Sequence, residues 1–261
     1  IWLYCKLEFM ISSCYIIRIK YLQFKEILQV FGLGYSYWEE VITVLREIIP
    51  VYDKVNKVIS LGKDESYRLF GISNNIHPGD LILDAGSGFG NMSMTALQCS
   101  NNKVGIVMFD PILEMLKNPK NNTSAQIYLK TSGIFEFLPF RNETFDVVMC
   151  GYSLRDAIEL QNAIAEVHRI LKTGGRFIVV DLGKPDLVFT RIGVNFYLKY
   201  ILRLLAFLTA GESGLRFKTL YGTYKKWPRN KTLFSLLSAK FSNVEFKKKM
   251  LGASIIISAT K

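Results

Sequence analysis

The sequence predicts an α/β fold with a mainly parallel sheet, helices on both faces and an antiparallel hairpin at the C-terminus. Short apolar runs alternate with stretches of helical periodicity, as is typical of parallel sheets; the runs cover residues 81–83, 103–109, 125–130, 145–150 and 176–181. Glycines at alternate positions follow the first run, at Gly86, Gly88 and Gly90. The last two runs, 243–246 and 253–259, have no helix between them, so one of them must run antiparallel.

Before the first strand the chain divides into an extension and a helical cap. Residues 1–36 are an N-terminal extension without an assigned structure, and Met10 is an alternative translation start to Ile1. Charged side chains repeatedly interrupt its apolar residues, so neither a spanning helix nor a signal peptide is expected, and we expect a cytoplasmic protein. The cap, residues 37–75, is predicted to contain helices over 37–49, 51–62 and 66–73.

The stretch Leu81–Gly90 is typical of a turn that binds a nucleotide-like ligand. A strand ends at Asp84, the glycines follow, and a helix begins at Asn91. Glycine permits positive φ and close approach of a ligand, and the helix N-terminus offers unpaired N–H groups. A dinucleotide fingerprint would place its third glycine where Asn91 stands, so the spacing alone leaves a dinucleotide and S-adenosylmethionine both open. Asp110, which closes the second strand, suits a ribose in either case or a helix N-cap.

The second half of the chain continues the alternation and then interrupts it. Helices are predicted over 111–117 and 156–171, the second ending at Gly174-Gly175, and a further helix over 231–239. An apolar insertion, residues 187–228, separates the fifth strand from that last helix. Its apolar residues favour a lid over an apolar ligand, with core packing as the alternative. Lys199 and Arg203 argue against a membrane span there and favour a position in the plane of a membrane interface.

Composition narrows the function classes. The net charge of +11 and pI of about 9.4 indicate either an anionic partner or a solvated basic surface. Four scattered cysteines and two histidines leave little for a zinc site, a disulfide framework or a Ser-His-Asp mechanism. No metal site is therefore predicted.

Several segments resemble class I S-adenosylmethionine-dependent methyltransferases. They are Phe137-Leu-Pro-Phe140, Phe145-Asp146, Leu171-Lys-Thr-Gly-Gly-Arg176 and the terminal hairpin. Thr173 stands where that family usually has proline. The resemblance implies a Rossmann-like class I methyltransferase fold and S-adenosylmethionine as the cofactor.

Further segments are similar to the quinone C-methyltransferases of menaquinone and ubiquinone biosynthesis. They are Tyr52-Asp-Lys-Val-Asn56, Ile59-Ser-Leu-Gly62, Tyr152-Ser-Leu-Arg-Asp156 and Gly183-Lys-Pro185. Ser153 and Asp156 replace that family's usual glycine and asparagine. The similarity runs from about residue 51 to the C-terminus and is weak over 187–228. It implies methylation of a ring carbon of a prenylated quinol.

The resemblance also implies roles for individual residues. The expected cofactor-binding residues are Asp84, Gly86, Gly88, Phe89, Asp110 and Gly151, with Ile134 and Phe135 packing against adenine where the family has a polar residue. Asp84 would hold the amino group and Asp110 the ribose; turn capping is the alternative role for Asp84. The expected catalytic residues are Arg155, Asp156 and Tyr52, with Asp53 beside them. Arg155 would stabilise a ring oxyanion and Asp156 would accept a proton, unless the two merely pair and cap the next helix.

Two other functions fit the sequence less well. One is methylation of another small molecule, such as a phenol, sterol or lipid. The other is RNA binding or RNA methylation, for which the basic aromatic segment Tyr221–Arg229 is the best support, although no known RNA-binding module is visible. The expected partners are therefore a small-molecule acceptor, an anionic membrane surface touched peripherally and, for a homodimer, a second copy, with no nucleic acid.

Overall fold

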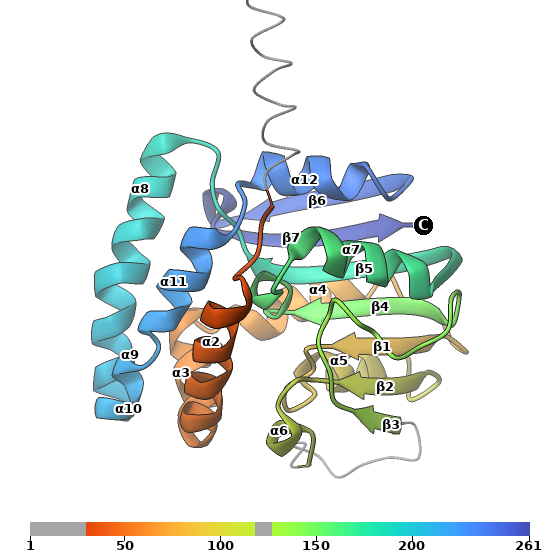
Figure 1. The fold of residues 1–261 in the computed structure, drawn as a ribbon, viewed down its shortest axis with the longest axis horizontal. Coiled ribbons are helices and arrows are strands. Elements are labelled where there is room, and N and C mark those ends of the chain that lie inside the picture. Colours follow the sequence, from red (N-terminus) through yellow and green to blue (C-terminus); the bar gives the residue numbers. More distant parts are fainter. Residues whose placement is uncertain (1–29, 118–126) are drawn as a thin grey trace, which may run out of the picture. The chain divides into compact units, whose positions relative to one another are not determined.

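The computed structural model describes residues 30–117 and 127–261, and its compact unit is Phe31–Lys261. In this part of the chain, seven strands form one sheet in the order β3-β2-β1-β4-β5-β7-β6 (Figure 1). The strands are β1 (Leu81–Ala85), β2 (Gly105–Phe109), β3 (Ile127–Thr131), β4 (Phe145–Gly151), β5 (Leu171–Leu182), β6 (Asn243–Lys249) and β7 (Ser254–Thr260).

The register of the sheet confirms the expected mixed topology. Strands β1 to β5 pair in parallel, whereas β7 runs antiparallel to both β5 and β6. From β1 the chain first builds outward through β2 and β3 and then returns to add β4 on the other side. The carboxyl ends of β1 and β4 therefore lie next to each other at a topological switch point, where open α/β sheets bind their ligands.

Helices cover both faces of the sheet, as predicted. On one face α4 (Asp64–Ile72) and α5 (Asn91–Cys99) pack on Ile82, Met149 and neighbouring side chains. On the other face α7 (Leu160–Ile170) and α12 (Asn230–Ser238) pack on Leu83, Val148 and their neighbours. Successive strand residues alternate between the two cores because side chains along a strand point to opposite faces.

A helical cap with its own core lies beside the carboxyl ends of the parallel strands (Figure 1). Two distant segments of the chain build it. The first contains α2 (Tyr35–Ile48), the short η1 (Ile49–Val51) and α3 (Tyr52–Ile59); the second contains α8 (Val188–Phe196), the π-helical η3 (Tyr197–Ile201), α9 (Leu202–Ala210), α10 (Glu212–Leu215) and α11 (Lys218–Lys226). Ile48 and Val55 from the first segment pack with Leu198, Leu202 and Tyr224 from the second.

Some boundaries differ from the predicted ones. The helix expected from residue 156 begins at Leu160, after a 3-10 turn η2 (Leu154–Asp156). Strand β5 begins at Leu171 rather than at residue 176, because the Gly174-Gly175 pair forms an irregularity inside the strand instead of ending a helix. Gly174 has φ +76, and it and Gly175 exchange backbone hydrogen bonds with Lys261. Helices α10 and α11 were not predicted, and short α6 (Leu113–Lys117) begins two residues late.

A few expectations fall outside the described residues. These are the alternative start at Met10, the extension up to residue 29, and the first two residues of the strand expected over 125–130. One helical stretch in the described ranges, Val188–Ala210, is long and apolar enough to cross a membrane by length and composition, with a mean hydropathy of 1.3.

Candidate active site

The glycine turn after β1 adopts a backbone that favours glycine at all three positions. Gly86, Gly88 and Gly90 have φ values of +70, +54 and +84, and Gly90 caps the N-terminus of α5. A Cβ on Gly86 would lie 2.3 Å from Cβ of Ser153, whose hydroxyl donates a 2.8 Å hydrogen bond to the carbonyl of Ala85. Glycine at 86 is thus required for the turn to meet the loop after β4, in addition to any approach of a ligand.

Asp84 lies behind this turn as a fully buried carboxylate that is only half satisfied. Its Oδ2 accepts hydrogen bonds from the amide and hydroxyl of Ser93, at 3.0 and 2.6 Å, while its Oδ1 has no hydrogen-bond partner among the described residues. Burial raises the pKa of Asp84 to about 7, against the lowering effect of the Ser93 hydrogen bonds. An unpaired buried carboxylate of this kind favours a cationic group nearby, such as the ammonium of an amino-acid moiety.

Asp110 connects the end of β2 to the glycine turn. Its two carboxylate oxygens accept 2.8 Å hydrogen bonds from the amides of Gly88 and Ile112. Burial raises its pKa to about 6, and the two backbone hydrogen bonds oppose the rise. Each carboxylate oxygen can accept a further hydrogen bond, so binding of ribose hydroxyls and support of the turn are compatible roles.

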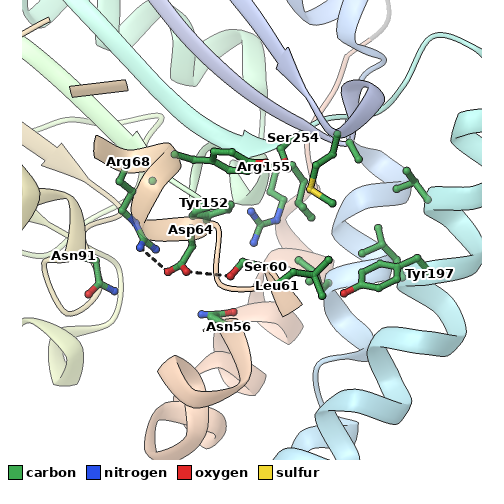
Figure 2. Close-up of a pocket in the computed structure, with 18 of the residues that line it drawn as sticks. Asn56, Ser60, Leu61, Asp64, Arg68, Asn91, Tyr152, Arg155, Tyr197 and Ser254 are labelled. Carbon is green, nitrogen blue, oxygen red and sulfur yellow. Dashed lines mark hydrogen bonds and ion pairs between the residues drawn. The ribbon is translucent and has the colours of Figure 1, made fainter. Parts of the chain in front are cut away.

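A cavity of about 430 Å³ lies between the sheet edge and the cap (Figure 2). Arg155 and Tyr152 reach into it from the sheet side, and Asn56, Ser60 and Tyr197 face them from the cap. Of the predicted site residues, those that line it are Tyr52, Gly86, Gly88, Phe89, Gly151 and Arg155. The others do not line it: Asp53, Asp84, Asp110, Ile134, Phe135 and Asp156.

Two of the predicted residues that do not line the cavity, Phe135 and Asp53, contact residues that do. The ring of Phe135 comes within 3.5 Å of where a Gly86 Cβ would stand, so it packs against the glycine turn. Asp53 on α3 accepts a 3.4 Å hydrogen bond from the side chain of Asn91, which does line the cavity. Within residues 30–117 and 127–261, no three His, Cys, Asp or Glu side chains group together in a way that could hold a metal ion.

Arg155 is a buried cation held by carboxylates on two elements. Its Nη1 donates a 2.5 Å hydrogen bond to Asp181 at the end of β5, and its Nε lies 3.8 Å from Oδ1 of Asp156. Burial lowers the pKa of Arg155, but Asp181 and Asp156 outweigh that effect and raise it, so the guanidinium keeps its charge. Its Nε is buried and has no hydrogen-bond partner among the described residues, although it is ion-paired with Asp156.

Asp156 and Tyr52 are ionisable groups beside this cation. Burial raises the pKa of Asp156 to about 6, with Arg155 acting in the opposite direction, and its Oδ1 makes no hydrogen bond within the described part of the chain. Burial also raises the pKa of the Tyr52 phenol. Near neutral pH Asp156 is therefore a carboxylate able to accept a proton, whereas Tyr52 stays neutral.

The structure adds a polar group that sequence reasoning missed. Arg68 on α4 donates a 2.8 Å hydrogen bond to Asp64, which also accepts one of 3.0 Å from Ser60, and the guanidinium lies 5.2 Å from the centroid of the Tyr152 ring. Although burial alone would raise the pKa of Asp64, Arg68 and Ser60 lower it. In the sequence, an aspartate and an arginine four residues apart look like an ordinary surface pair on a helix, so nothing indicated that they line a cavity.

Tyr152 adopts a strained backbone at the same place. Its φ of +61 is uncommon for a residue with a side chain, and its amide donates a 2.7 Å hydrogen bond to the carbonyl of Val180. Strained residues of this kind cluster at ligand sites. Tyr152 belongs to a segment that resembles the quinone C-methyltransferases, but that resemblance implies no role for it.

Solved structures share the fold. An S-adenosylmethionine-dependent methyltransferase of Thermotoga maritima, described as a possible histamine N-methyltransferase, has a TM-score of 0.55 at 16% identity, covering 84% of this chain and 99% of its own. An S-adenosylmethionine-dependent methyltransferase of Aquifex aeolicus has a TM-score of 0.52 at 12% identity, covering 80% and 97%.

Curated relatives are similar over most of their length. A demethylmenaquinone methyltransferase of Symbiobacterium thermophilum is 30% identical over 82% of this chain and 90% of its own. A ubiquinone/menaquinone biosynthesis C-methyltransferase of Desulfotalea psychrophila is 30% identical over 77% and 82%. The profile of the ubiE/COQ5 methyltransferase family matches residues 35–261. The chain therefore belongs to the ubiE/COQ5 methyltransferase family and is an S-adenosylmethionine-dependent methyltransferase.

Proposed function

We propose that this methyltransferase methylates a ring carbon of a quinol that carries an apolar isoprenoid tail. The observation that carries the proposal is the Arg155 guanidinium, buried, charged and directed into a cavity whose far wall on α8 and η3 includes Val194 and Leu198. A ring oxyanion fits the charged guanidinium, and a hydrocarbon tail fits the apolar far wall. The names of the relatives from S. thermophilum and D. psychrophila support a quinone-type acceptor.

The residues of the cavity have distinct tasks in this reaction. When bound, S-adenosylmethionine supplies an activated methyl group, which leaves sulfur with the bonding electrons remaining there as the ring carbon bonds to it. Arg155 stabilises the ionised ring hydroxyl, which directs electron density to the neighbouring carbon. Asp156, which lies beside Arg155 but does not line the cavity, accepts through a water the proton that this carbon loses. Tyr52 lies on the cap side and positions the ring.

The cofactor is assigned to the glycine turn. Asp84 offers its unpaired Oδ1 to the ammonium group, and Asp110 offers the remaining lone pairs of its carboxylate to the ribose. The backbone of Gly86, Gly88 and Phe89 borders the cofactor on the cavity side. Phe135, which packs against the turn from behind, and its neighbour Ile134 are assigned to the adenine, and Gly151 lines the cavity at the end of β4.

A tail-bearing acceptor also fixes where the enzyme works. Such a quinol resides in a bilayer, so the enzyme must reach a membrane surface peripherally. We place it at the cytoplasmic side, since both cysteines in the described residues, Cys99 and Cys150, are free thiols, as in a reducing compartment.

Transfer of labelled methyl from the cofactor into a total lipid extract, compared with RNA, tests the proposal. We expect label in the quinone fraction, and Arg155→Lys should lower kcat by about 100-fold with little change in cofactor affinity, since a lysine cannot reproduce the geometry of the guanidinium. Label in another lipid class would favour a different small-molecule acceptor. Label in RNA would overturn the proposal.

A further inference from the structure

An unpartnered apolar surface runs along the α8–η3–α9 helix. It consists of every fourth residue of the segment, each between 52% and 72% exposed: Val188, Ile192, Phe196, Tyr200, Leu204 and Leu208, here called the apolar stripe. A four-residue spacing drifts around a straight α-helix by about 40° per step. The π-helical turn η3 has more residues per turn, which offsets part of this drift, and all six side chains stay exposed along the segment.

The charged residues within the segment that carries the stripe are all basic, and Asp186 and Glu212 flank it at the two ends. The sequence from residue 187 to 211 contains three basic residues, Arg191, Lys199 and Arg203, and no aspartate or glutamate. Lys199 and Arg203 are exposed beside the stripe, and Nζ of Lys199 lies 5.0 Å from the centroid of the Tyr200 ring. An exposed apolar surface with basic side chains beside it matches the boundary between acyl chains and anionic headgroups.

The helix that carries the stripe also forms one side of the cavity. Gly193, Val194 and Tyr197 of this segment line the cavity. Three exposed apolar residues also line the cavity, Leu61, Met250 and Leu251, here called the rim, with exposed fractions of 57%, 50% and 85%. All three have positive φ, at +52, +48 and +55.

The rim resembles the stripe in its charge environment. Lys247 and Lys249, on the strand that ends before Met250, place their ammonium groups 5.1 and 4.6 Å from the centroid of the Phe70 ring, and Lys247 also pairs with Glu245. The mouth of the cavity is thus framed by exposed apolar side chains with cations close by. Exposure of these apolar side chains to water is unfavourable, whereas their burial in the hydrocarbon of a lipid bilayer is favourable.

We propose that the apolar stripe and the rim dock on the surface of an anionic lipid bilayer, with the α8–η3–α9 helix lying in the interface plane and the cavity mouth opening into the lipid. This inference rests on the proposed function, because it explains how a quinol brings its ring to Arg155 while its tail stays among the acyl chains. The reacting ring then never has to cross bulk water.

Two other uses of the stripe fit the structure less well. The helix is long enough to span a bilayer, but Leu198, Leu202 and Ala206 on its other side are buried in the core of the cap. A symmetric contact with a second copy through the stripe would bring the Lys199 and Arg203 side chains of both copies into one interface with no acidic residue of the stripe segment to pair with them, which like charges disfavour. A lipid surface needs neither unpacking of the cap nor burial of like charges.

Sedimentation of the full chain with vesicles tests the docking. Vesicles of phosphatidylglycerol and phosphatidylcholine should bind the protein, and Phe196→Glu or Leu204→Glu should weaken binding by about tenfold or more. The matched control is Leu129→Glu on β3, at the sheet edge remote from the cap, where the leucine is 50% exposed as against 56% for Leu204. It should bind vesicles like the wild type, and all variants should keep their cofactor affinity.

Three results would overturn the docking proposal: no vesicle binding by the wild type, equal loss in Leu129→Glu, or a dimer in sedimentation equilibrium that Leu204→Glu dissociates without any vesicle binding. A second comparison separates docking from function. Leu204→Glu should lower methylation of a tailed quinol in vesicles while leaving a tail-less quinol in solution unaffected; equal loss on both would refute docking. Stripe-dependent vesicle binding without methylation of any quinol would uphold docking and refute the acceptor.

Discussion

Asp156 is the residue whose protonation state should control turnover. Its pKa is raised to about 6, chiefly by burial, so it loses its proton as the pH rises through that value. If it accepts the ring proton, kcat at saturating cofactor should rise between about pH 5 and 7 and then level off. Asp156→Asn should abolish the rise and lower the plateau by about 100-fold or more.

The pH profile needs a control because other carboxylates titrate nearby. The pKa values of Asp110 and Asp84 are raised to about 6 and about 7. Both lie on the cofactor side, so their titration should affect cofactor binding rather than kcat at saturation. If kcat still rises with pH in Asp156→Asn, the rise belongs to the titration of Asp84 or Asp110, and Asp156 is not the proton acceptor.

Asp84 illustrates a conflict between stability and binding within one residue. Its folded pKa of about 7 exceeds its ordinary value of 3.8, so folding favours the protonated form. Its contribution to stability is complete below about pH 4 and is lost as the pH rises through about 7, a difference on the order of 4 kcal/mol. Asp84→Asn mimics the neutral form and should raise the melting temperature of the cofactor-free protein at pH 8 but not at pH 4.

The same substitution should weaken cofactor binding, because the ammonium group loses its countercharge. Thermal unfolding with and without S-adenosylmethionine measures both effects on one sample. A melting temperature at pH 8 that falls in Asp84→Asn would mean that the hydrogen bonds from Ser93 outweigh the buried charge. Unchanged cofactor affinity would leave Asp84 as a structural cap of α5.

At the scale of the elements, substitution of Gly86 in the glycine turn can be tested against a matched control at Gly62. Gly86 and Gly62 both have φ +70, but a Cβ on Gly86 would lie 2.3 Å from Ser153 whereas one on Gly62 has no atom within 4 Å. Alanine at either position should cost about 1 kcal/mol or more for the backbone alone. Gly86→Ala should cost about 1–3 kcal/mol more for the clash and should also lose cofactor affinity.

Denaturant unfolding of the two variants, with cofactor titration, checks this. Equal destabilisation would show that the β4 loop yields to the added methyl group. Retained cofactor affinity in Gly86→Ala would mean that the turn can shift without disturbing the site.

The sequence specified elements whose signals are local. The glycine turn, the strands and the terminal hairpin follow from residue patterns within about ten positions, and the structure agrees with them. Strand β5 was predicted too short because Gly174-Gly175 reads as a helix stop, and only its pairing with Lys261 shows an irregular strand. The cap could not be predicted as one layer, because its core joins residues as far apart as Val55 and Tyr224.

The candidate site shows the same division. Arg155 and the glycines were identified from motifs, and the sheet order then places Asp181 beside Arg155 at the ends of adjacent strands. The group of Ser60, Asp64 and Arg68 depends on how α4 packs against the cavity, which no pattern in the sequence reveals.

For the molecule as a whole, the net charge of +11 fits either a solvated basic surface or an anionic partner. The salt dependence of vesicle binding separates the contribution of charge from that of the apolar stripe. Electrostatic attraction to an anionic vesicle is screened by salt, whereas burial of the apolar stripe is not. Between about 0.05 and 0.5 M salt, wild-type binding should weaken but not vanish. Leu204→Glu should lose the salt-resistant part, and a Lys199→Glu/Arg203→Glu variant should lose much of the salt-sensitive part.

A homopolymeric RNA serves as the control: electrostatic binding to it should disappear at high salt and be indifferent to Leu204→Glu. Vesicle binding that vanishes with salt in the same way would leave the basic surface as its whole cause and refute a role for the stripe.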